Sequence, residues 1–183
     1  MRVIAGSLGG RRFNAPRGRA TRPTSERVRE ALFGMLGELE GATVLDLFAG
    51  TGALGIEALS RGAERAVFVE RDACTARVLR ANLAALGIEP AAAEVRRVDA
   101  LAALRSARAR KETYDLLFID PPYSQAHEWA PELSAILPSL LSPGARIVLE
   151  SDRRAPLELP LEVIRRRRYG DTSITIHAIN DPI

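Results

Sequence analysis

The sequence has few of the side chains that form disulfides and metal sites. Its 183 residues include one cysteine, Cys74, and two histidines, His127 and His177. A single thiol cannot form an internal disulfide, and three widely spaced ligands do not make a metal cluster. We therefore expect neither a disulfide nor a structural metal.

Long apolar runs are also missing. No stretch approaches the roughly 18 apolar residues that a membrane-spanning helix needs, and residues 1–6 lack the apolar core of a signal peptide. Hydrophobic residues nevertheless make up 46% of the chain and charged residues 27%, a composition typical of a soluble globular protein. The sequence predicts one compact domain that stays in the cytosol.

The first forty residues contain two expected elements. Residues 3–5 and 12–14 flank a glycine-rich turn, which predicts a small N-terminal β-hairpin. A helix should then run from about Ser25 to Leu39, because its apolar residues recur at helical spacing. Thr24 is the expected N-cap of this helix.

After Gly41, buried strands alternate with helical segments, a pattern that predicts a parallel sheet covered on both faces. The last two strands are joined directly at Gly170-Asp171, so the sheet should end in an antiparallel pair. Ordinary dinucleotide-binding folds lack that ending. The class I S-adenosylmethionine-dependent methyltransferase fold, which is Rossmann-like, has it. We expect a mostly parallel seven-stranded sheet with strands at residues 44–48, 66–70, 95–98, 114–120, 146–150, 161–169 and 172–179.

Positive charge is concentrated at the start of the chain. The net charge is +3, yet residues 1–30 hold eight arginines and only two glutamates. A basic front end on a mildly acidic body favours a polyanionic partner, although a solvated basic tail explains the charge equally well. We divide the chain into a basic hairpin extension, residues 1–22, and a main domain, residues 23–183. The arginines expected to contact a nucleic acid are Arg2, Arg11, Arg12, Arg17, Arg19 and Arg22.

A glycine-rich segment follows the first strand, at the sheet edge where α/β folds bind ligands. Its glycines let the backbone approach a ligand, and the next helix offers free N–H groups. Gly50, Gly52 and Gly55 fit the pattern G-x-G-x-x-G, which alone does not distinguish a dinucleotide from another cofactor. The residues of this segment expected to bind the cofactor are Asp46, Phe48, Ala49, Gly50, Thr51 and Gly52.

Three acids at the ends of three successive strands favour a cationic cofactor. Asp46 would repel a pyrophosphate but suits the ammonium of a methionyl group. Glu70 is placed to accept hydrogen bonds from both ribose hydroxyls, and Asp99 to accept one from an adenine amino group. Solvated strand-end acids are the alternative, which the ordered spacing makes weaker. We expect S-adenosylmethionine here, with Arg71 and Ala100 also in contact.

The segment Asp120-Pro121-Pro122-Tyr123 follows the fourth strand. The double proline excludes a helix and fixes the Pro121 carbonyl. An amino group on an aromatic base is a poor nucleophile, because its lone pair is delocalised into the ring. The Asp120 carboxylate and the Pro121 carbonyl would accept its hydrogens and turn the nitrogen toward the methyl donor, while Tyr123 stacks on the base. We expect these four residues to be catalytic, with Asp120 also touching the cofactor. Taken alone, the segment fits a simple turn after a strand better; beside the glycine-rich segment, it favours the catalytic interpretation.

Together these motifs resemble the bacterial 16S ribosomal RNA guanine-N2 methyltransferases, an RsmD-like family, over nearly the whole chain. The Asp-Pro-Pro-Tyr segment is similar to the amino-methyltransferase motif whose first residue is Asp, Asn or Ser. The glycine turn with its helix, the basic front end and the last hairpin turn add to the likeness. The segments that carry it are residues 2–6, 10–12, 22–24, 27–33, 48–62, 120–123 and 169–172.

The resemblance implies a site and a substrate. It implies S-adenosylmethionine over residues 46–52, Glu70 and Asp99, with Thr24 and Arg27 closing one side. The implied product is N2-methylguanine in 16S ribosomal RNA. We expect a monomer that acts on a small-subunit particle, and naked RNA stays open as an alternative substrate. A base inside a duplex is out of reach, so the target must be unpaired or flipped out.

Three alternatives stay open. The Asp-Pro-Pro-Tyr segment also serves adenine-N6 methylation, but such DNA enzymes usually carry a target-recognition region that 183 residues barely accommodate. A nicotinamide-dependent oxidoreductase would explain the glycines and leave Asp46 and Asp120 without a role. A non-catalytic RNA-binding module of the same fold would not need Asp120 and Tyr123.

Overall fold

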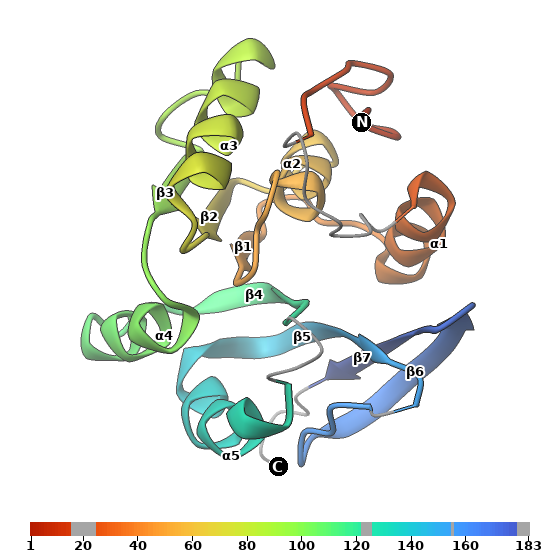
Figure 1. Cartoon of the computed structure of the whole chain (residues 1–183), viewed down its shortest axis with the longest axis vertical. Helices are drawn as coiled ribbons and strands as arrows, with labels where there is room; N and C mark the ends of the chain where they lie inside the picture. Colours follow the sequence, from red (N-terminus) through yellow and green to blue (C-terminus); the bar gives the residue numbers. More distant parts are fainter. Residues whose placement is uncertain (16–24, 122–125, 155, 179–183) are drawn as a thin grey trace.

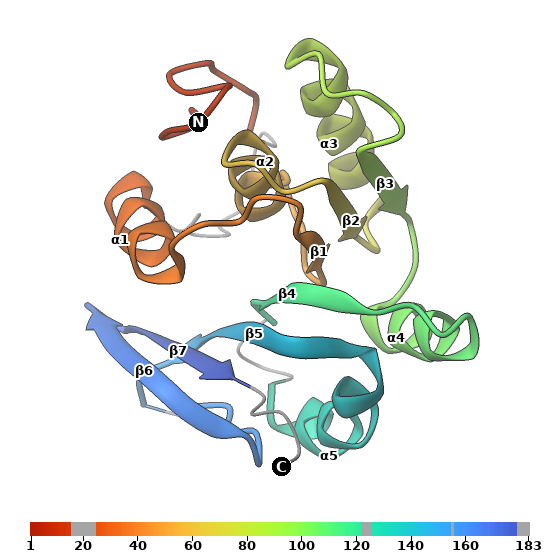
Figure 2. The ribbon, with the colours of Figure 1, turned by 180° about the vertical axis from the view of Figure 1, so that it is seen from behind.

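One mixed sheet runs through the molecule, with helices on both faces (Figures 1 and 2). The computed structural model describes residues 1–15, 25–121, 126–154 and 156–178. The strands are β1 (Thr43–Asp46), β2 (Arg65–Val69), β3 (Ala93–Arg96), β4 (Tyr114–Ile119), β5 (Leu141–Asp152), β6 (Glu162–Tyr169) and β7 (Thr172–Ala178). The helices are α1 (Glu26–Leu36), α2 (Ala53–Ser60), α3 (Ala73–Ala85), α4 (Ala100–Ala109), α5 (Ala126–Ile136) and a short 3-10 helix, η2 (Leu137–Leu140).

The sheet has the strand order β3-β2-β1-β4-β5-β7-β6. Strands β1 to β5 pair in parallel, and β7 lies antiparallel between β5 and β6. The expected seven-stranded sheet with an antiparallel C-terminal pair is therefore confirmed. The strand order reverses between β1 and β4. In such sheets, ligands bind beyond the carboxyl ends of the strands at this switch point.

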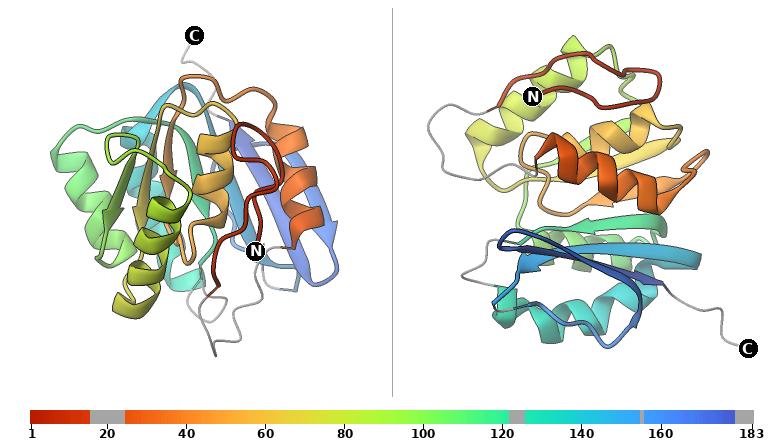
Figure 3. Two further views of the ribbon diagram at one scale, coloured as in Figure 1. Left: turned by 90° about the horizontal axis from the view of Figure 1, so that it is seen from above. Right: turned by 90° about the vertical axis from the view of Figure 1, so that its right-hand side faces the viewer.

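Alternate residues of the central strands enter two separate hydrophobic clusters, because successive side chains of a strand point to opposite faces. Val44 and Phe118 belong to the cluster that α1, α2 and α3 cover, whereas Leu45 and Leu117 belong to the cluster under α4 and α5. Figure 3 shows these two helical layers on either side of the sheet. Burial on both faces explains why these strands are continuous apolar runs.

Several elements differ from their predicted bounds. Strand β5 differs most, since it runs from Leu141 to Asp152 and was predicted only at residues 146–150, and β1 ends at Asp46, two residues earlier than predicted. Helix α1 begins after Ser25, whose hydroxyl accepts a hydrogen bond from the Val28 N–H at 3.3 Å, so Ser25 is the N-cap. The predicted cap, Thr24, lies outside the described residues. The helix ends at Leu36 because Gly37 takes a φ of 73°. Strand β3 covers residues 93–96, two residues earlier than predicted, where it pairs with β2.

The N-terminal segment, residues 1–15, folds back on itself as predicted, but its strand pairing is reduced to one antiparallel bridge between Arg2 and Arg12. A longer ladder does not form because the N–H groups of Ile4 and Ala5 donate to the Glu57 carboxylate of α2, at 2.8 and 3.1 Å. Other contacts also fasten this segment to the body. The side-chain amide of Asn82, on α3, donates to the Asn14 carbonyl at 3.0 Å and to the Thr51 carbonyl at 3.1 Å. Val3 and Phe13 are buried in the cluster that α1 covers.

Over the part of the chain that the structure describes, no helix combines the length and apolarity needed to cross a membrane.

Candidate active site

The glycine turn between β1 and α2 uses its glycines for different reasons. Gly50 and Gly52 take positive φ values of 53° and 86°, which favour glycine. A Cβ on Gly55 would lie 2.3 Å from Cε1 of Phe68, so this glycine lets α2 pack closely against β2. The turn thus brings backbone N–H groups to the carboxyl end of β1, at the switch point.

Asp46 ends β1 and is buried beneath this turn. Its Oδ2 accepts a hydrogen bond from the Gly55 N–H at 3.1 Å, which closes the turn onto the strand. Burial raises the pKa of Asp46 to about 7; the bond from Gly55 opposes that rise, and the nearby Glu70 carboxylate adds to it. In this structure the carboxyl group therefore supports the turn. Its contact with a ligand's ammonium remains a prediction.

Glu70 follows β2 and binds the glycine turn from the other side. Its Oε2 accepts from the Gly50 N–H at 3.0 Å, and its Oε1 accepts from the Asp72 N–H at 2.7 Å. The side chain is half-buried beside the turn. This position suits the predicted role at a ribose and also gives Glu70 a structural one. Arg71, next in the chain, is exposed.

Asp99 lies after β3 and is the N-cap of α4. Its Oδ1 accepts from the N–H groups of Leu101 and Ala102, at 2.9 and 3.4 Å. The residue is exposed and Ala100 is buried behind it. The structure explains Asp99 as a cap, and its role toward an adenine remains a prediction.

Phe48 brings an aromatic residue from another element to the site. Its ring packs on Trp129 of α5, with centroids 4.9 Å apart and planes tilted by 32°. The sequence favours Trp129 as a core residue over a residue that lines a base pocket. The structure buries its side chain and places it against the expected cofactor-binding Phe48.

Asp120 lies directly after β4, beside an acid that the sequence did not single out. The β4–β5 register pairs Ile119 with Leu149, which brings Asp120 next to Glu150. Burial raises the pKa of Asp120 well above its usual range, and the charges of Glu150 and then Asp46 raise it further. The nearness of Glu150 depends on strand register, which no local motif reveals.

The three acids Asp46, Asp120 and Glu150 therefore meet at the switch point, and Asp46 and Glu150 are buried. Carboxylates held together in this way attract a positively charged ligand, because such a ligand relieves their mutual repulsion. Perturbed acids in such a position are a mark of functional sites. Of the other expected catalytic residues, Pro121 is buried, and Pro122 and Tyr123 lie outside the described residues.

The arginines of the N-terminal segment have different surroundings. The Arg11 guanidinium donates to the carbonyls of Leu86 and Ala85, at 2.6 and 2.9 Å, and so binds the C-terminal end of α3. Arg2 forms an ion pair with Glu26 at 2.8 Å, and Arg12 is exposed. The other arginines expected to bind nucleic acid, Arg17, Arg19 and Arg22, lie outside the described residues.

Arg29 counts toward the basic front end in the sequence, but the structure buries it completely. Its guanidinium donates to the Arg2 carbonyl at 2.7 Å and to the Ala53 carbonyl at 3.4 Å, so it joins α1, the N-terminal segment and the start of α2. Burial lowers the pKa of Arg29, and Glu57 partly offsets this effect. Helical periodicity places Arg29 no differently from an exposed arginine, so no sequence pattern indicates its burial.

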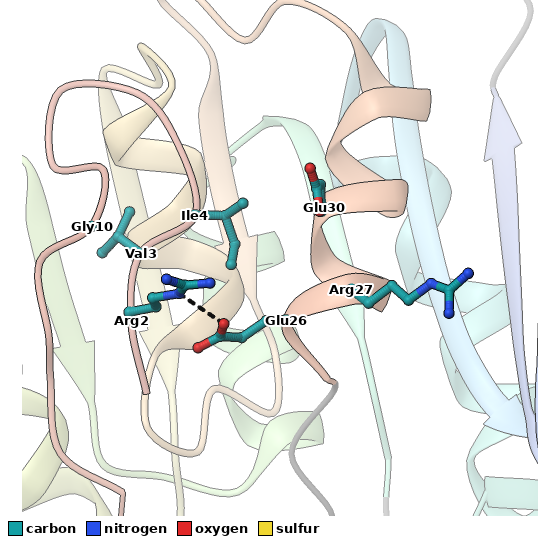
Figure 4. A pocket seen from close by; sticks show the side chains of 7 residues that line it. All are labelled: Arg2, Val3, Ile4, Gly10, Glu26, Arg27 and Glu30. Carbon is teal, nitrogen blue, oxygen red and sulfur yellow. Dashed lines mark hydrogen bonds and ion pairs between the residues drawn. The ribbon is translucent and has the colours of Figure 1, made fainter.

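A pocket of about 470 Å³ lies between the N-terminal segment and α1 (Figure 4). Arg2 reaches Glu26 in this pocket, whereas the Arg27 side chain points away from that pair. The closure of the cofactor site by Arg27 and Thr24 remains a prediction, since Thr24 is not among the described residues. The lining residues are Arg2, Val3, Ile4, Gly10, Glu26, Arg27 and Glu30.

Within the described ranges, the structure has no group of three or more His, Cys, Asp and Glu side chains that could hold a metal ion.

Comparison with known proteins gives a family and a fold. The family model described as "Conserved hypothetical protein 95" matches residues 1–178. Ribosomal RNA small subunit methyltransferase D of Haemophilus influenzae is 34% identical over 163 residues, which cover 87% of this chain and 83% of that protein. The solved structure of yhhF from Escherichia coli has a TM-score of 0.85 and 32% identity, covering 100% of this chain and 99% of that one.

A more distant structure shares the same fold. The RNA methyltransferase from Salinibacter ruber, solved in complex with S-adenosyl-L-homocysteine, has a TM-score of 0.64 and 23% identity, and the match covers 88% of this chain and 95% of that one. The Rossmann-like methyltransferase fold expected from the strand pattern is thus confirmed.

Proposed function

Since this chain belongs to the family described as conserved hypothetical protein 95, we propose that it methylates the N2 amino group of a guanine in 16S ribosomal RNA, with S-adenosylmethionine as the donor. The observation that carries this proposal is the meeting of Asp46, Asp120 and Glu150 at the switch point of the sheet. The ribosomal RNA methyltransferase of Haemophilus influenzae, at 34% identity, supports the class of substrate.

The residues of the site fit this cofactor. A Cβ on Gly50 would meet nothing closer than the Phe48 carbonyl oxygen at 3.9 Å, so the turn leaves room for a ligand against its backbone. Asp46 and Asp120 would hold the positively charged end of the cofactor, while Glu70 and Asp99 would accept hydrogen bonds from its ribose and adenine. When bound, S-adenosylmethionine supplies a methyl group on a positively charged sulfur.

The chain itself positions the amine that receives the methyl group. Asp120 and the Pro121 carbonyl accept the two hydrogens of the amino group and hold its nitrogen toward the donor. A cation beside Asp120 lowers the pKa of that carboxyl group, so it accepts hydrogen bonds as a carboxylate. Holding both reactants in line contributes about 7–11 kcal/mol to such reactions, so orientation supplies most of the acceleration.

The remaining parts of the proposal concern the setting of the reaction. The enzyme works in the cytosol as a monomer without a metal ion, and its substrate is the RNA within a small-subunit particle. Residues 23–183 form the methyltransferase domain, and residues 1–22 are a basic extension that helps to hold the RNA. The target guanine is unpaired or flipped out of its helix.

The test is methylation of small-subunit RNA with isotopically labelled S-adenosylmethionine, using naked RNA and assembled particles, followed by mass mapping of the digested RNA. We expect labelled N2-methylguanine from the wild type and at least about 100-fold less from Asp120→Ala, because the amino group then loses one of the two acceptors that orient it, and misplacement of a reactant costs about that much. The exposed acid Glu89 provides a matched control, and Glu89→Gln should stay active.

Two results would overturn the proposal in different ways. Labelled N6-methyladenine would identify the chain as an adenine methyltransferase. Binding of S-adenosylhomocysteine and RNA without methylation of either RNA form would identify a non-catalytic RNA-binding module.

A further inference from the structure

The outer strand of the sheet, β6, carries a concentration of positive charge. Residues 165–168 are four consecutive arginines, and Glu162 is the one acid of the strand. All its residues but Tyr169 are exposed, and Val163 and Ile164 are 44% and 50% exposed. No described strand pairs with the outer side of β6.

These charges are poorly neutralised by the protein. Of the four arginines, Arg166 has an acid within reach, Glu158 at 3.9 Å. Arg165, Arg167 and Arg168 form no ion pair with any acid among the described residues. Elsewhere, some exposed arginines, such as Arg65 and Arg105, form an ion pair with a glutamate, and others, such as Arg12 and Arg97, form none within the described part of the chain. What distinguishes β6 is that three arginines without an ion pair to a described acid lie within four consecutive positions of one strand.

Charged side chains on an edge strand also prevent pairing with a second molecule, and a few would suffice for that purpose. The register places these particular charges relative to the site. Arg168 lies opposite Ser173 of β7, and Ser173 lies opposite Ser151 of β5. Ser151 follows Glu150, which is the neighbour of Asp120. Arg168 therefore lies at the same edge of the sheet as the candidate active site.

Strand spacing sets the distance between the arginines and Asp120. Three steps separate β4 from β6, so at about 4.8 Å per step Arg168 is about 14 Å from Asp120 across the sheet. Arg165 lies three residues further along β6, about 10 Å farther from that edge. The arginines thus form a row that begins near the site and leads away from it.

The row carries charge on both faces of the strand. Arg165 and Arg167 lie opposite Ile176 and Ile174, which belong to the cluster that α1 covers, whereas Arg168 lies opposite Ser173. An exposed ridge with guanidinium groups on both sides suits a flexible polyanion, since each group can bind a phosphate through two parallel hydrogen bonds.

We infer that β6 is a docking surface for the phosphate backbone of the substrate RNA, beside the nucleotide whose base enters the site. This inference rests on the proposed function and adds a surface that the sequence analysis did not identify. Of the N-terminal arginines that the structure describes, Arg11 and Arg2 already bind groups of the protein. In the β6 row, Arg167 donates only to the neighbouring Arg166 carbonyl at 3.2 Å, and Arg166 lies 3.9 Å from Glu158. Arg165 and Arg168 have no such partner among the described residues, so the row keeps charge available to RNA.

The test compares two triple variants of the full chain. Arg165, Arg167 and Arg168 are replaced by glutamine in the first. Arg105, Arg108 and Arg110 are replaced by glutamine in the second, because these exposed residues belong to α4 or follow it, away from β6 (Figure 1). Both variants lose three positive charges, so any general effect of net charge is the same. Binding of small-subunit RNA is measured at several salt concentrations without S-adenosylmethionine, and affinity for S-adenosylhomocysteine is the check on the fold.

We expect the β6 triple variant to bind RNA at least tenfold more weakly at low salt, with unchanged affinity for S-adenosylhomocysteine. Its plot of log affinity against log salt should be flatter by about 2 to 3, because each lost phosphate contact removes about 0.7–0.9 from the slope. The α4 triple variant should match the wild type. If the β6 triple variant folds poorly, the single changes Arg165→Gln, Arg167→Gln and Arg168→Gln should each flatten the slope by about 0.7–0.9.

The surface and the proposed function can fail separately. Equal effects of the two triple variants, or none from either, would overturn the β6 surface even when the wild type methylates guanine. A further outcome is a wild type that binds RNA but methylates none. If the β6 triple variant alone then loses RNA binding, the surface is supported and the proposed function is overturned.

Discussion

The Asp46 carboxyl group accepts a hydrogen bond from the Gly55 N–H at 3.1 Å, across the full width of the glycine turn. One residue ends the first strand and the other packs α2 onto β2, so the bond fixes the shape of the turn before any ligand arrives. The acid that makes this bond is buried, and its pKa is raised to about 7.

This raised pKa predicts how stability depends on pH. Asp46 has a pKa of about 7 when folded and an ordinary value of 3.8. Its contribution is fully present below the ordinary value and is lost as the pH rises through about 7, because the folded state binds the proton more tightly. In the absence of cofactor, the Tm of the wild type should fall between pH 4 and pH 7. The Tm of Asp46→Asn should fall less over this range, because asparagine does not titrate and still accepts from Gly55. Thermal melts across this range check it; parallel curves for the two proteins would refute it.

Glu70 has a ligand role and a structural role that two substitutions can separate. Glu70→Gln removes the charge and keeps an acceptor for Gly50, whereas Glu70→Ala removes both. Both changes should weaken S-adenosylhomocysteine binding about tenfold or more, since hydrogen bonds to charged groups contribute about 1.5–3 kcal/mol. Glu70→Ala should also destabilise the protein by about 1–3 kcal/mol more than Glu70→Gln, because glutamine keeps one of the two acceptor oxygens used by the Gly50 and Asp72 N–H groups. Calorimetric titration and urea unfolding measure the two effects, with Glu89→Gln as the control.

Neighbouring arginines of the N-terminal segment should behave differently. Arg11→Gln should lower the free energy of unfolding by about 1–2 kcal/mol, because the carbonyls of Ala85 and Leu86 lose a charged donor at the end of α3. Arg12→Gln should leave stability within about 0.5 kcal/mol of the wild type, since Arg12 is exposed. Urea unfolding compares the two variants, and equal stabilities would show that Arg11 does not cap α3 in solution.

Alanine substitutions at Gly50, in the glycine turn, and at Gly55, in α2, should affect stability and cofactor binding differently. A Cβ on Gly55 would lie 2.3 Å from the Phe68 ring, so Gly55→Ala should destabilise the protein by about 1–3 kcal/mol. Around Gly50 there is room, and Gly50→Ala should cost about 1–2 kcal/mol for its positive φ alone. The new methyl group would, however, point into the space proposed for the cofactor. Gly50→Ala should therefore lose affinity for S-adenosylhomocysteine by a larger factor than Gly55→Ala, and the reverse order would contradict this assignment.

The sequence predicted the sheet well because its strands are short apolar runs separated by helices. The antiparallel ending followed from Gly170-Asp171, which leaves no room for a helix between β6 and β7. The acids Asp46, Glu70 and Asp99 also lie where the alternation of strands and helices predicts them, at or after the carboxyl ends of β1, β2 and β3. These features depend on local pattern, which a sequence displays directly.

The features that the sequence could not predict depend on distant partners. Glu57 and Arg29 are charged residues that pattern analysis places on solvated helix faces, yet both are completely buried. Glu57 is satisfied by N–H groups more than fifty positions away, at Ile4 and Ala5. Glu150 meets Asp120 through strand register. Charge counted along the chain pointed to the front end, whereas the structure shows three arginines without an acidic partner among the described residues within four consecutive positions of β6.

The attachment of residues 1–15 has a consequence for the order of events during synthesis. This segment leaves the ribosome before its partners exist, because Ile4 binds Glu57 and Asn14 binds Asn82, at separations of 53 and 68 residues. Until α3 has emerged, the apolar Val3 and Phe13 have little to pack against, and the segment stays available to chaperones. The N-terminal segment is therefore among the last parts to pack on the side of the sheet that α1, α2 and α3 cover. Asn82 also donates to the Thr51 carbonyl, so the segment and the glycine turn are held by the same side chain of α3.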